Sequence, residues 1–259
     1  AKQIFHWLQS GVTDFDEMTD ISKALRERLK ADAYIADAET ERRYASRLDE
    51  TVKYVFRLFD GELIETVLMK YEHGYTVCIS TQVGCRMGCK FCASGINGLT
   101  RSLTASEMLA QITAVQRDNN IRVSNIVMMG MGEPLDNFDN SVRFLKLVSD
   151  ENGLNIGLRH ISLSTSGVVS GIKKLKEYNL PITLSISLHA PSDDIRSSVM
   201  PVNKRWNIDE LLAACKEYQA VTTRRISFEY ALIAGVNDGR EDADELQGLL
   251  GGWVAHINL

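Results

Sequence analysis

The chain has 259 residues, of which 44% are apolar, and a formal net charge of −5. This apolar content can fill one large domain, or one domain with a small appendage. The negative charge argues against a protein coated in basic residues for nucleic acid, although it permits a local basic surface. No apolar run approaches membrane-spanning length and no signal peptide is visible, so the free thiols predict a cytoplasmic protein with no membrane segment.

The amino-terminal residues, 1–38, predict a small helical region. Thr19 and Asp20 are suited to cap a helix that begins at Ile21 and repeats leucines on one face. The charged side chains between the leucines are expected to form a solvated face.

Residues 39–74 predict a charged linker, 39–50, and then a β-hairpin extension. Two β-rich segments, 52–59 and 63–69, flank the dipeptide Asp60-Gly61. Because Asp-Gly favours a tight hairpin turn, the two segments are expected to pair as antiparallel strands.

From residue 75 to residue 259 the pattern changes to strands that alternate with helices. Strands are expected at 75–80, 125–129, 160–164, 182–188, 225–232 and 255–259. Helices are expected from a capping box at Thr104–Glu107 and over roughly 138–150, 168–178, 207–219 and 240–250. The alternation predicts an α/β fold with a parallel sheet, a partial (βα)6 barrel with fewer strands than a complete TIM barrel. Because the sixth strand has no helix after it, the sequence is expected to be a truncated piece of a longer protein.

Three of the five cysteines lie within eight residues: Cys85, Cys89 and Cys92, spaced C-x3-C-x2-C. Three thiolates on one tight loop can hold three irons of a [4Fe–4S] cluster and leave the fourth iron open to a small molecule. Gly84 and Gly88 allow the backbone to curl close to such a cluster.

Zinc, disulfides and plain buried thiols are the alternatives for these cysteines. Zinc would take Cys78 as a fourth thiolate, but Cys78 lies seven residues before Cys85 and no second cysteine pair follows at the usual distance. An odd number of crowded cysteines in a chain of this size does not suggest disulfides.

The polar residues fall where the predicted parallel strands end. The cysteine loop follows the first of these strands, and segments 130–134 and 164–167 follow the second and third. Ser187-Leu188-His189 closes the fourth. Because chemistry collects at the carboxyl ends of parallel strands, these segments are expected to share one mouth.

With these residues in view, the chain resembles the RlmN/Cfr family of radical S-adenosylmethionine (SAM) RNA methyltransferases. The cysteine spacing is the signature of the radical SAM superfamily, and the RlmN-like form is matched by segments 15–20, 78–94, 127–134, 163–169, 186–191 and 235–238. The resemblance covers nearly the whole chain. The Cfr-like form, which acts on carbon 8 of adenine, tends to differ at 133–134, 164–167 and 188–190, so the resemblance favours methylation of carbon 2.

The resemblance implies a [4Fe–4S] cluster held by Cys85, Cys89 and Cys92, with SAM bound at its open iron and cleaved to a radical by an electron from the cluster. It also implies a set of further SAM contacts: Gly132, Glu133, Ser164, Ser187, Leu188 and His189. Taken singly, a serine near a strand end is an ordinary turn residue and His189 an ordinary core histidine.

Two further residues, Glu65 and Cys78, match catalytic positions of the family. The resemblance implies that Glu65 transfers a proton on adenine, and that Cys78 resolves a covalent enzyme–RNA adduct by disulfide formation. The alternatives are a solvent-facing strand residue for Glu65 and a core thiol for Cys78. Cys215, in the middle of a predicted helix, is expected to be a packing residue.

The resemblance also implies a methyl-carrying cysteine near the carboxyl terminus, methylated by one SAM molecule and activated through a second. No cysteine follows Cys215. The methyl-carrying cysteine is therefore missing, and this chain is expected to bind the cluster without completing methyl transfer.

The implied partners are ribosomal RNA and transfer RNA as substrates and an electron donor such as flavodoxin, with the protein itself expected to be a monomer. The candidate phosphate contacts are Arg101, Lys173-Lys174, Lys204-Arg205 and Arg224-Arg225. Two other functions stay open: a radical SAM enzyme acting on a small molecule or peptide, and a zinc-binding RNA adaptor.

Overall fold

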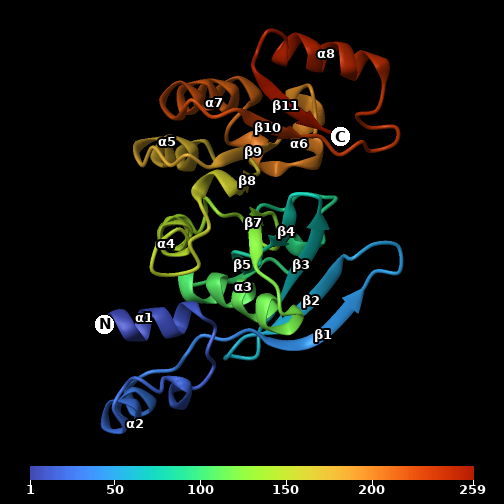
Figure 1. Cartoon of the computed structure of the whole chain (residues 1–259). Coiled ribbons are helices and arrows are strands. Elements are labelled where there is room, and N and C mark those ends of the chain that lie inside the picture. Colours follow the sequence, from blue (N-terminus) through green and yellow to red (C-terminus); the bar gives the residue numbers. More distant parts are fainter.

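A nine-stranded sheet forms the spine of the molecule in the computed structural model, which describes all 259 residues (Figure 1). Its strand order is β1-β2-β3-β4-β7-β8-β9-β10-β11, and β5 and β6 form a separate two-stranded ribbon. The strands are β1 (Glu39–Ala45), β2 (Val52–Arg57), β3 (Leu63–Tyr71), β4 (Gly74–Cys78), β5 (Gln82–Gly84), β6 (Leu99–Ser102), β7 (Val123–Met128), β8 (Ile161–Thr165), β9 (Thr183–Ser187), β10 (Ile226–Glu229) and β11 (Ala255–Asn258).

Two helices precede the sheet, and the others lie in the connections between the parallel strands. The helices are α1 (Lys2–Gln9), α2 (Lys23–Asp32), α3 (Ala105–Asn119), α4 (Phe138–Val148), α5 (Val169–Glu177), α6 (Asp193–Val199), α7 (Ile208–Thr222) and α8 (Arg240–Leu250), with short 3-10 turns η1 (Phe15–Glu17), η2 (Ala93–Gly95), η3 (Leu158–His160) and η4 (Pro201–Lys204). Figure 1 shows α4, α5 and α7 on one side of the strands. One core of 48 buried residues joins these helices to the sheet. No helix has the length and apolar character that crossing a membrane would require.

The predicted partial barrel is confirmed. From β4 to β11 all six strands run parallel, in chain order, and each coincides with a strand expected from the sequence. Apolar side chains on alternate positions, such as Ile126, Leu163 and Leu184, are fully buried against the helices. The opposite, inner face of these strands carries polar side chains, and Ser162 and Ser185 share a hydrogen bond of 2.8 Å there. The sheet therefore packs on one face and leaves the other available for a site.

The predicted linker at 39–50 is wrong over its first half, because Glu39–Ala45 form β1. All seven of its residues are exposed, so the strand has no apolar alternation by which the sequence could reveal it. Backbone pairing with β2 and the ion pair between Arg57 and Glu41 hold it in place. The β2–β3 hairpin is present, and β3 pairs with β4, so the hairpin continues the barrel sheet.

The amino-terminal helical region packs on a small apolar cluster of its own, formed by Val12, Phe15, Met18 and Ile21. The predicted cap of the second helix is corrected: Ser22 is the N-cap of α2, and its Oγ accepts from the backbone N–H of Leu25. Helix α6 was not expected from the sequence. It lies between β9 and α7 and supplies a residue of the site described below.

Candidate active site

The cysteine loop is held at both ends by the β5–β6 ribbon. The backbone N–H of Cys85, directly after β5, donates to the carbonyl oxygen of Gly98, directly before β6, at 2.9 Å. Gly84 has φ +75, and a Cβ there would lie 2.0 Å from that carbonyl oxygen. Only glycine allows so close an approach, so the base of the loop requires it.

All three cysteines of the loop line one cavity of about 330 Å³ at the carboxyl ends of β7, β8 and β9. Cys85 is buried, and Cys89 and Cys92 are partly buried. Burial raises the pKa of Cys89 to about 11, with the neighbouring Cys92 and Cys85 thiols adding to the effect. Burial likewise raises the pKa of Cys85. Without a cation the Cys85 and Cys89 thiols are therefore protonated at neutral pH, and a metal that binds them must displace their protons.

The donor set fits a [4Fe–4S] cluster with one open iron. Three soft sulfur donors come from one loop, and no carboxylate or imidazole ligand lies between them in the sequence. Two of the flanking glycines, Gly84 and Gly88, have positive φ and bend the backbone around the thiols. No group of three or more Cys, His, Asp or Glu side chains is already arranged around a point that could hold a single metal ion. Cys85, Cys89 and Cys92 are the residues that would hold the cluster.

Glu133 lies on the wall of this cavity, in the loop after β7. Its carboxylate accepts two backbone hydrogen bonds, one from Ser166 at 2.7 Å and one from Leu135 at 3.0 Å. Burial raises the pKa of Glu133, and these backbone donors oppose the shift. A buried carboxylate with spare lone pairs facing a cavity is suited to bind a cationic group, because a cation would offset its desolvation.

Gly132, beside Glu133, also lines the cavity, and it has φ +103. A Cβ at this position would lie 2.8 Å from the backbone nitrogen of Gln82 in β5. The glycine thus lets the loop after β7 pack against the ribbon that carries the cysteines. This packing accounts for glycine at 132 whether or not its backbone also contacts a ligand.

Ser164 and Ser187 stand near the carboxyl ends of β8 and β9 and line the same cavity. Their strands pair directly, with Ser164 opposite Ser185. Ser166, the residue directly after β8, is also buried in the cavity wall, and its Oγ has no hydrogen-bond partner. This hydroxyl lies beside the Glu133 carboxylate and is free to donate a hydrogen bond to a polar group in the cavity.

His189 completes the wall and holds a left-handed backbone conformation with φ 54. Its Nδ1 accepts from the backbone N–H of Ala231 at 2.9 Å, which places the ring proton on Nε2. Burial, together with the positive charge of Arg196, lowers the pKa of His189 to about 4. The imidazole is therefore neutral at physiological pH and offers one N–H donor to the site.

Three of the predicted site residues do not line the cavity. The side chain of Leu188 is fully buried in the core, and its backbone N–H donates to the carbonyl oxygen of Glu229 at 3.0 Å. Glu65 is exposed on β3, with one carboxylate oxygen 2.6 Å from Nζ of Lys53. Cys78 is partly buried at the end of β4, and desolvation raises its pKa to about 11.

Strand register nevertheless puts Glu65 and Cys78 on the inner face of the sheet. Val67 on β3 is opposite Cys78, and Cys78 is opposite Val127 on β7. Paired residues point to the same face, and so do residues two apart on one strand. Glu65 therefore points to the same face as Val67. The inner face therefore carries Glu65, Cys78 and the serines of β8 and β9 together.

Sequence reasoning missed Arg196, which holds the strand ends in position. The guanidinium is fully buried and donates to the carbonyl oxygens of Ser166 (2.6 Å), Ser187 (3.0 Å) and Leu188 (3.0 Å), and to Oδ1 of Asn203 (2.9 Å). Burial lowers the pKa of Arg196 to about 10, so it stays charged at neutral pH. In Asp-Asp-Ile-Arg196 it looks like surface charge, and only its burial in the fold distinguishes it.

Glu229, the last residue of β10, was missed as well. Its carboxylate lines the cavity and accepts from Ser227 Oγ at 2.9 Å and from Asn258 Nδ2 at 2.7 Å. Its position at the end of β10, one strand beyond the residues singled out from the sequence, was the available signal.

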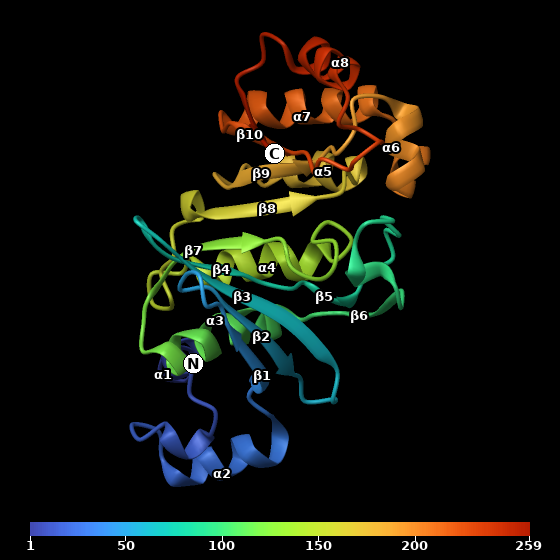
Figure 2. The ribbon, with the colours of Figure 1, turned by 90° about the vertical axis from the view of Figure 1, so that its right-hand side faces the viewer.

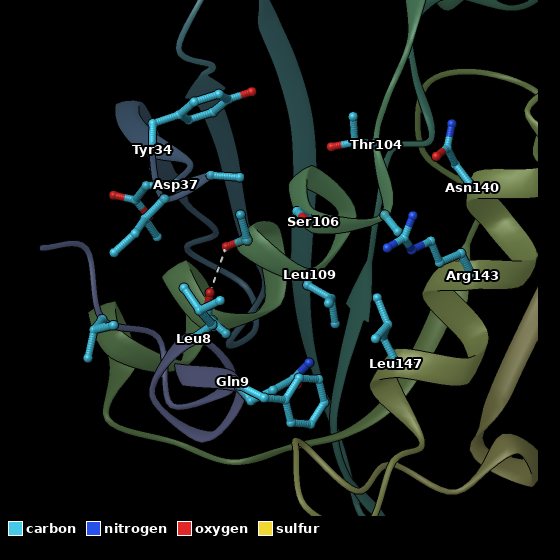
Figure 3. Close-up of a pocket in the computed structure, with 17 residues that line it drawn as sticks. Leu8, Gln9, Tyr34, Asp37, Thr104, Ser106, Leu109, Asn140, Arg143 and Leu147 are labelled. Atoms are coloured by element: carbon cyan, nitrogen blue, oxygen red, sulfur yellow. Dashed lines mark hydrogen bonds between the residues drawn. The ribbon is translucent and has the colours of Figure 1, made fainter. Parts of the chain in front are cut away.

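A larger cavity of about 550 Å³ lies elsewhere, between α1, residues 34–37, α3 and α4 (Figure 3). Leu8, Leu109 and Leu147 line it from the three helices. It contains no cysteine or histidine, and it does not share a residue with the strand-end cavity. The strand-end cavity, which contains the cysteines and His189, is therefore the candidate active site.

Comparison with known proteins agrees with this geometry. Residues 79–246 match the family model of the radical SAM superfamily, and residues 1–35 match the ribosomal RNA large subunit methyltransferase N-terminal domain. A radical SAM methyltransferase from Sphaerobacter thermophilus, solved by crystallography, superposes with a TM-score of 0.94 at 46% identity, covering 100% of this chain and 77% of the other. The fold, the cysteine loop and the strand-end cavity are thus those of a radical SAM enzyme, with a [4Fe–4S] cluster and SAM as cofactors.

Two curated relatives narrow the class. A "probable dual-specificity RNA methyltransferase RlmN" of Alkaliphilus oremlandii is 56% identical over 259 residues, and one of Clostridium novyi is 52% identical over 260 residues. Each match covers 100% of this chain and 76% of the relative. The chain belongs to the RlmN family of the radical SAM superfamily.

Proposed function

We propose that this protein methylates carbon 2 of adenine in large-subunit ribosomal RNA and in transfer RNA, through a methyl-cysteine intermediate. The observation that carries the proposal is the inner face of the sheet, on which Glu65 and Cys78 share a side with the strand-end cavity. A radical SAM site needs only the cavity. The extra carboxylate and thiol suit a reaction that also moves a proton and resolves a covalent adduct. The names of the relatives support RNA as the substrate.

In this proposal the residues that line the cavity bind the cluster and SAM and orient SAM for the reaction. When bound, the cluster and SAM supply a radical able to remove a hydrogen atom from an unactivated carbon. Glu133 would hold the ammonium of the SAM methionine, for which a buried carboxylate is the natural partner. Ser164, Ser187 and the Nε2–H of His189 would supply hydrogen bonds to its polar atoms.

Glu65 and Cys78 act on the nucleic-acid side in this proposal. Glu65 is exposed and balanced by Lys53, so it can carry a proton to or from adenine without a large desolvation cost. Cys78 is mostly protonated while buried, because its pKa is raised to about 11. It would become a nucleophile only when a base in the site removes its proton.

In this proposal the methyl-carrying cysteine lies outside these 259 residues. Cys215, the last cysteine, is fully buried in α7, and burial raises its pKa to about 12. It cannot be methylated without unfolding the helix from the core. We therefore expect these residues to bind the cluster and SAM, and methyl transfer to require a chain that also carries the missing cysteine.

The proposed partners follow from the reaction. An electron donor such as flavodoxin would reduce the cluster, and the protein would act as a monomer in the cytoplasm, where ribosomal and transfer RNA are made.

The test is the position of the methyl group. A ribosomal RNA fragment is incubated anaerobically with SAM, a reductant and a chain that continues past residue 259 to the further cysteine, and its nucleosides are separated by mass spectrometry. 2-Methyladenosine is expected from that chain and none from residues 1–259 alone. 8-Methyladenosine would instead indicate a Cfr-like enzyme, and no methylated adenosine with consumption of SAM would favour a small-molecule or peptide substrate.

A further inference from the structure

The four basic groups predicted to contact phosphates differ in their partners and in their distance from the active-site cavity. Arg101 is committed to two carboxylates, with distances of 2.6 Å to Asp60 and 2.8 Å to Glu107. Lys174 pairs with Asp139 at 2.9 Å, and its Nζ lies 4.0 Å from the centroid of the Phe138 ring. Arg101 and Lys174 therefore already have partners within the protein, whereas Lys173 is exposed in the middle of α5, away from the strand ends.

The Arg224-Arg225 pair lines a different cavity of about 530 Å³ on the inner face of the sheet, which shares Met129 and Glu229 with the strand-end cavity. The pair directly precedes β10, so it sits at the amino ends of the parallel strands, opposite the cysteine loop. Arg224 donates there to Oγ1 of Thr183, the first residue of β9.

Lys204 and Arg205 lie at the rim of the active-site cavity. They end the η4 turn, which begins directly after Met200, a residue of the cavity wall. The cysteine loop packs on this segment: the backbone N–H of Lys90 donates to the carbonyl oxygen of Val199 at 2.9 Å. In Figure 2 the arrow of β8 points to the side on which both the β5–β6 ribbon and α6 lie.

The rim cations have no acidic partner. Lys90, Lys204 and Arg205 are exposed, and none of them forms a salt bridge. The Arg205 guanidinium lies over the Trp206 ring, 4.4 Å from its centroid, in a cation–π contact. The nearby Asp193 is occupied, because it accepts from Asn203 Nδ2 at 2.8 Å and from the Ile208 N–H at 2.9 Å.

We propose that this rim surface, formed by Lys90, Lys204 and Arg205, binds the RNA phosphates that flank the target nucleotide. The inference rests on the proposed function, since it assumes that RNA is the substrate. A base that reaches SAM at the mouth of the strand-end cavity leaves its own phosphates outside that cavity. Unpaired cations at that point attract the phosphates of the RNA, which the protein's net charge of −5 otherwise repels.

The experiment measures RNA binding by the 259-residue protein over a range of salt concentrations, using fluorescence anisotropy of a labelled stem-loop RNA. The test variant is Lys204→Ala with Arg205→Ala, which leaves the cysteine loop intact. The matched control is Arg122→Ala with Arg159→Ala, which removes the same charge from two exposed residues that lie just before β7 and β8, at the opposite end of the sheet.

The rim variant is expected to bind about tenfold more weakly near 0.1 M salt, and its slope of log affinity against log salt should fall by about 1.4–1.8. The control should match the wild type. If the rim variant keeps both the affinity and the slope of a wild type that binds RNA, the inference about the rim is overturned while the proposed function stands. If the wild type itself binds no RNA at low salt, the substrate in the proposed function is overturned, and the rim inference with it.

Discussion

The backbone N–H of Ala231 donates a hydrogen bond of 2.9 Å to Nδ1 of His189. This contact joins the loop after β10 to the end of β9 and fixes the tautomer of the imidazole. Because the ring is buried and near Arg196, the pKa of His189 is lowered to about 4. A histidine in the unfolded chain has a pKa of about 6.5. Between that pH and about 4, His189 is therefore protonated in the unfolded chain and neutral in the folded one.

The first prediction concerns acid stability of the cluster-free protein. The free energy of unfolding should fall as pH drops from about 6.5 to 4, with His189 accounting for about 3 kcal/mol over that window. His189→Asn should flatten this acid limb, because asparagine tolerates φ 54 and can accept from Ala231 but does not titrate. Urea unfolding at pH 7 and pH 4.5 compares the two proteins. Glu133 and Glu229 are the same in both proteins. If both lose the same free energy of unfolding between pH 7 and pH 4.5, His189 is not the titrating group.

The second prediction concerns the ligands of the cluster. After anaerobic reconstitution, the wild type should contain about four iron and four sulfide per chain. Cys89→Ala removes one of the three thiols on the cavity and should lower both values severely. Cys215→Ala, which removes a core thiol outside the cavity, is the control and should keep the full content. Full iron content in Cys89→Ala would mean that the loop is not the ligand set.

The third prediction concerns SAM affinity. Glu133→Gln removes the buried charge that would face the methionine ammonium, and a charged hydrogen bond is worth roughly 1.5–3 kcal/mol. Calorimetry on the cluster-loaded protein should therefore show an affinity lower by about 10–150-fold. Asp139→Asn, which changes an exposed carboxylate on α4, should bind SAM like the wild type. Unchanged affinity in Glu133→Gln would place the SAM ammonium elsewhere.

The fourth prediction concerns Arg196, a positioning residue. Arg196→Met keeps much of the side-chain volume but leaves the carbonyl oxygens of Ser166, Ser187 and Leu188 without this donor. We expect a loss of about 2–4 kcal/mol in the free energy of unfolding, since buried acceptors lose their partners. Arg205→Met, at an exposed arginine, should change stability by less than about 0.5 kcal/mol.

Variants of the same two arginines can also be compared by their affinity for SAM. Arg196→Lys restores a charge but not the fork of donors, so it should recover only part of the stability. SAM affinity should fall in Arg196→Met and stay unchanged in Arg205→Met, because only Arg196 fixes the strand ends that bear Ser187 and His189. A stable Arg196→Met protein with normal SAM affinity would refute the positioning role.

The sequence predicts the parallel part of the fold well, because its strands alternate with amphipathic helices and its cysteines have a diagnostic spacing. It does not predict β1, whose residues are all exposed and whose stability comes from backbone pairing. It does not predict Arg196, since burial of a charge depends on carbonyl groups from β8 and β9 that are distant in sequence.

Glu65 and Cys78 show a different limit. The sequence places them on separate strands of unknown pairing. Only the register across β3, β4 and β7 puts both on the inner face of the sheet. Their chemical roles remain predictions, whereas their common face is a property of the fold.

The most direct measurement of the central claim is the low-temperature electron paramagnetic resonance spectrum of the reconstituted, reduced protein, recorded with and without SAM. If the cysteine loop holds a cluster with one open iron facing Glu133 and the strand-end serines, the spectrum should be that of a reduced [4Fe–4S] cluster and should change when SAM is added. Stoichiometric zinc without iron, or a cluster spectrum that SAM leaves unaltered, would contradict the account.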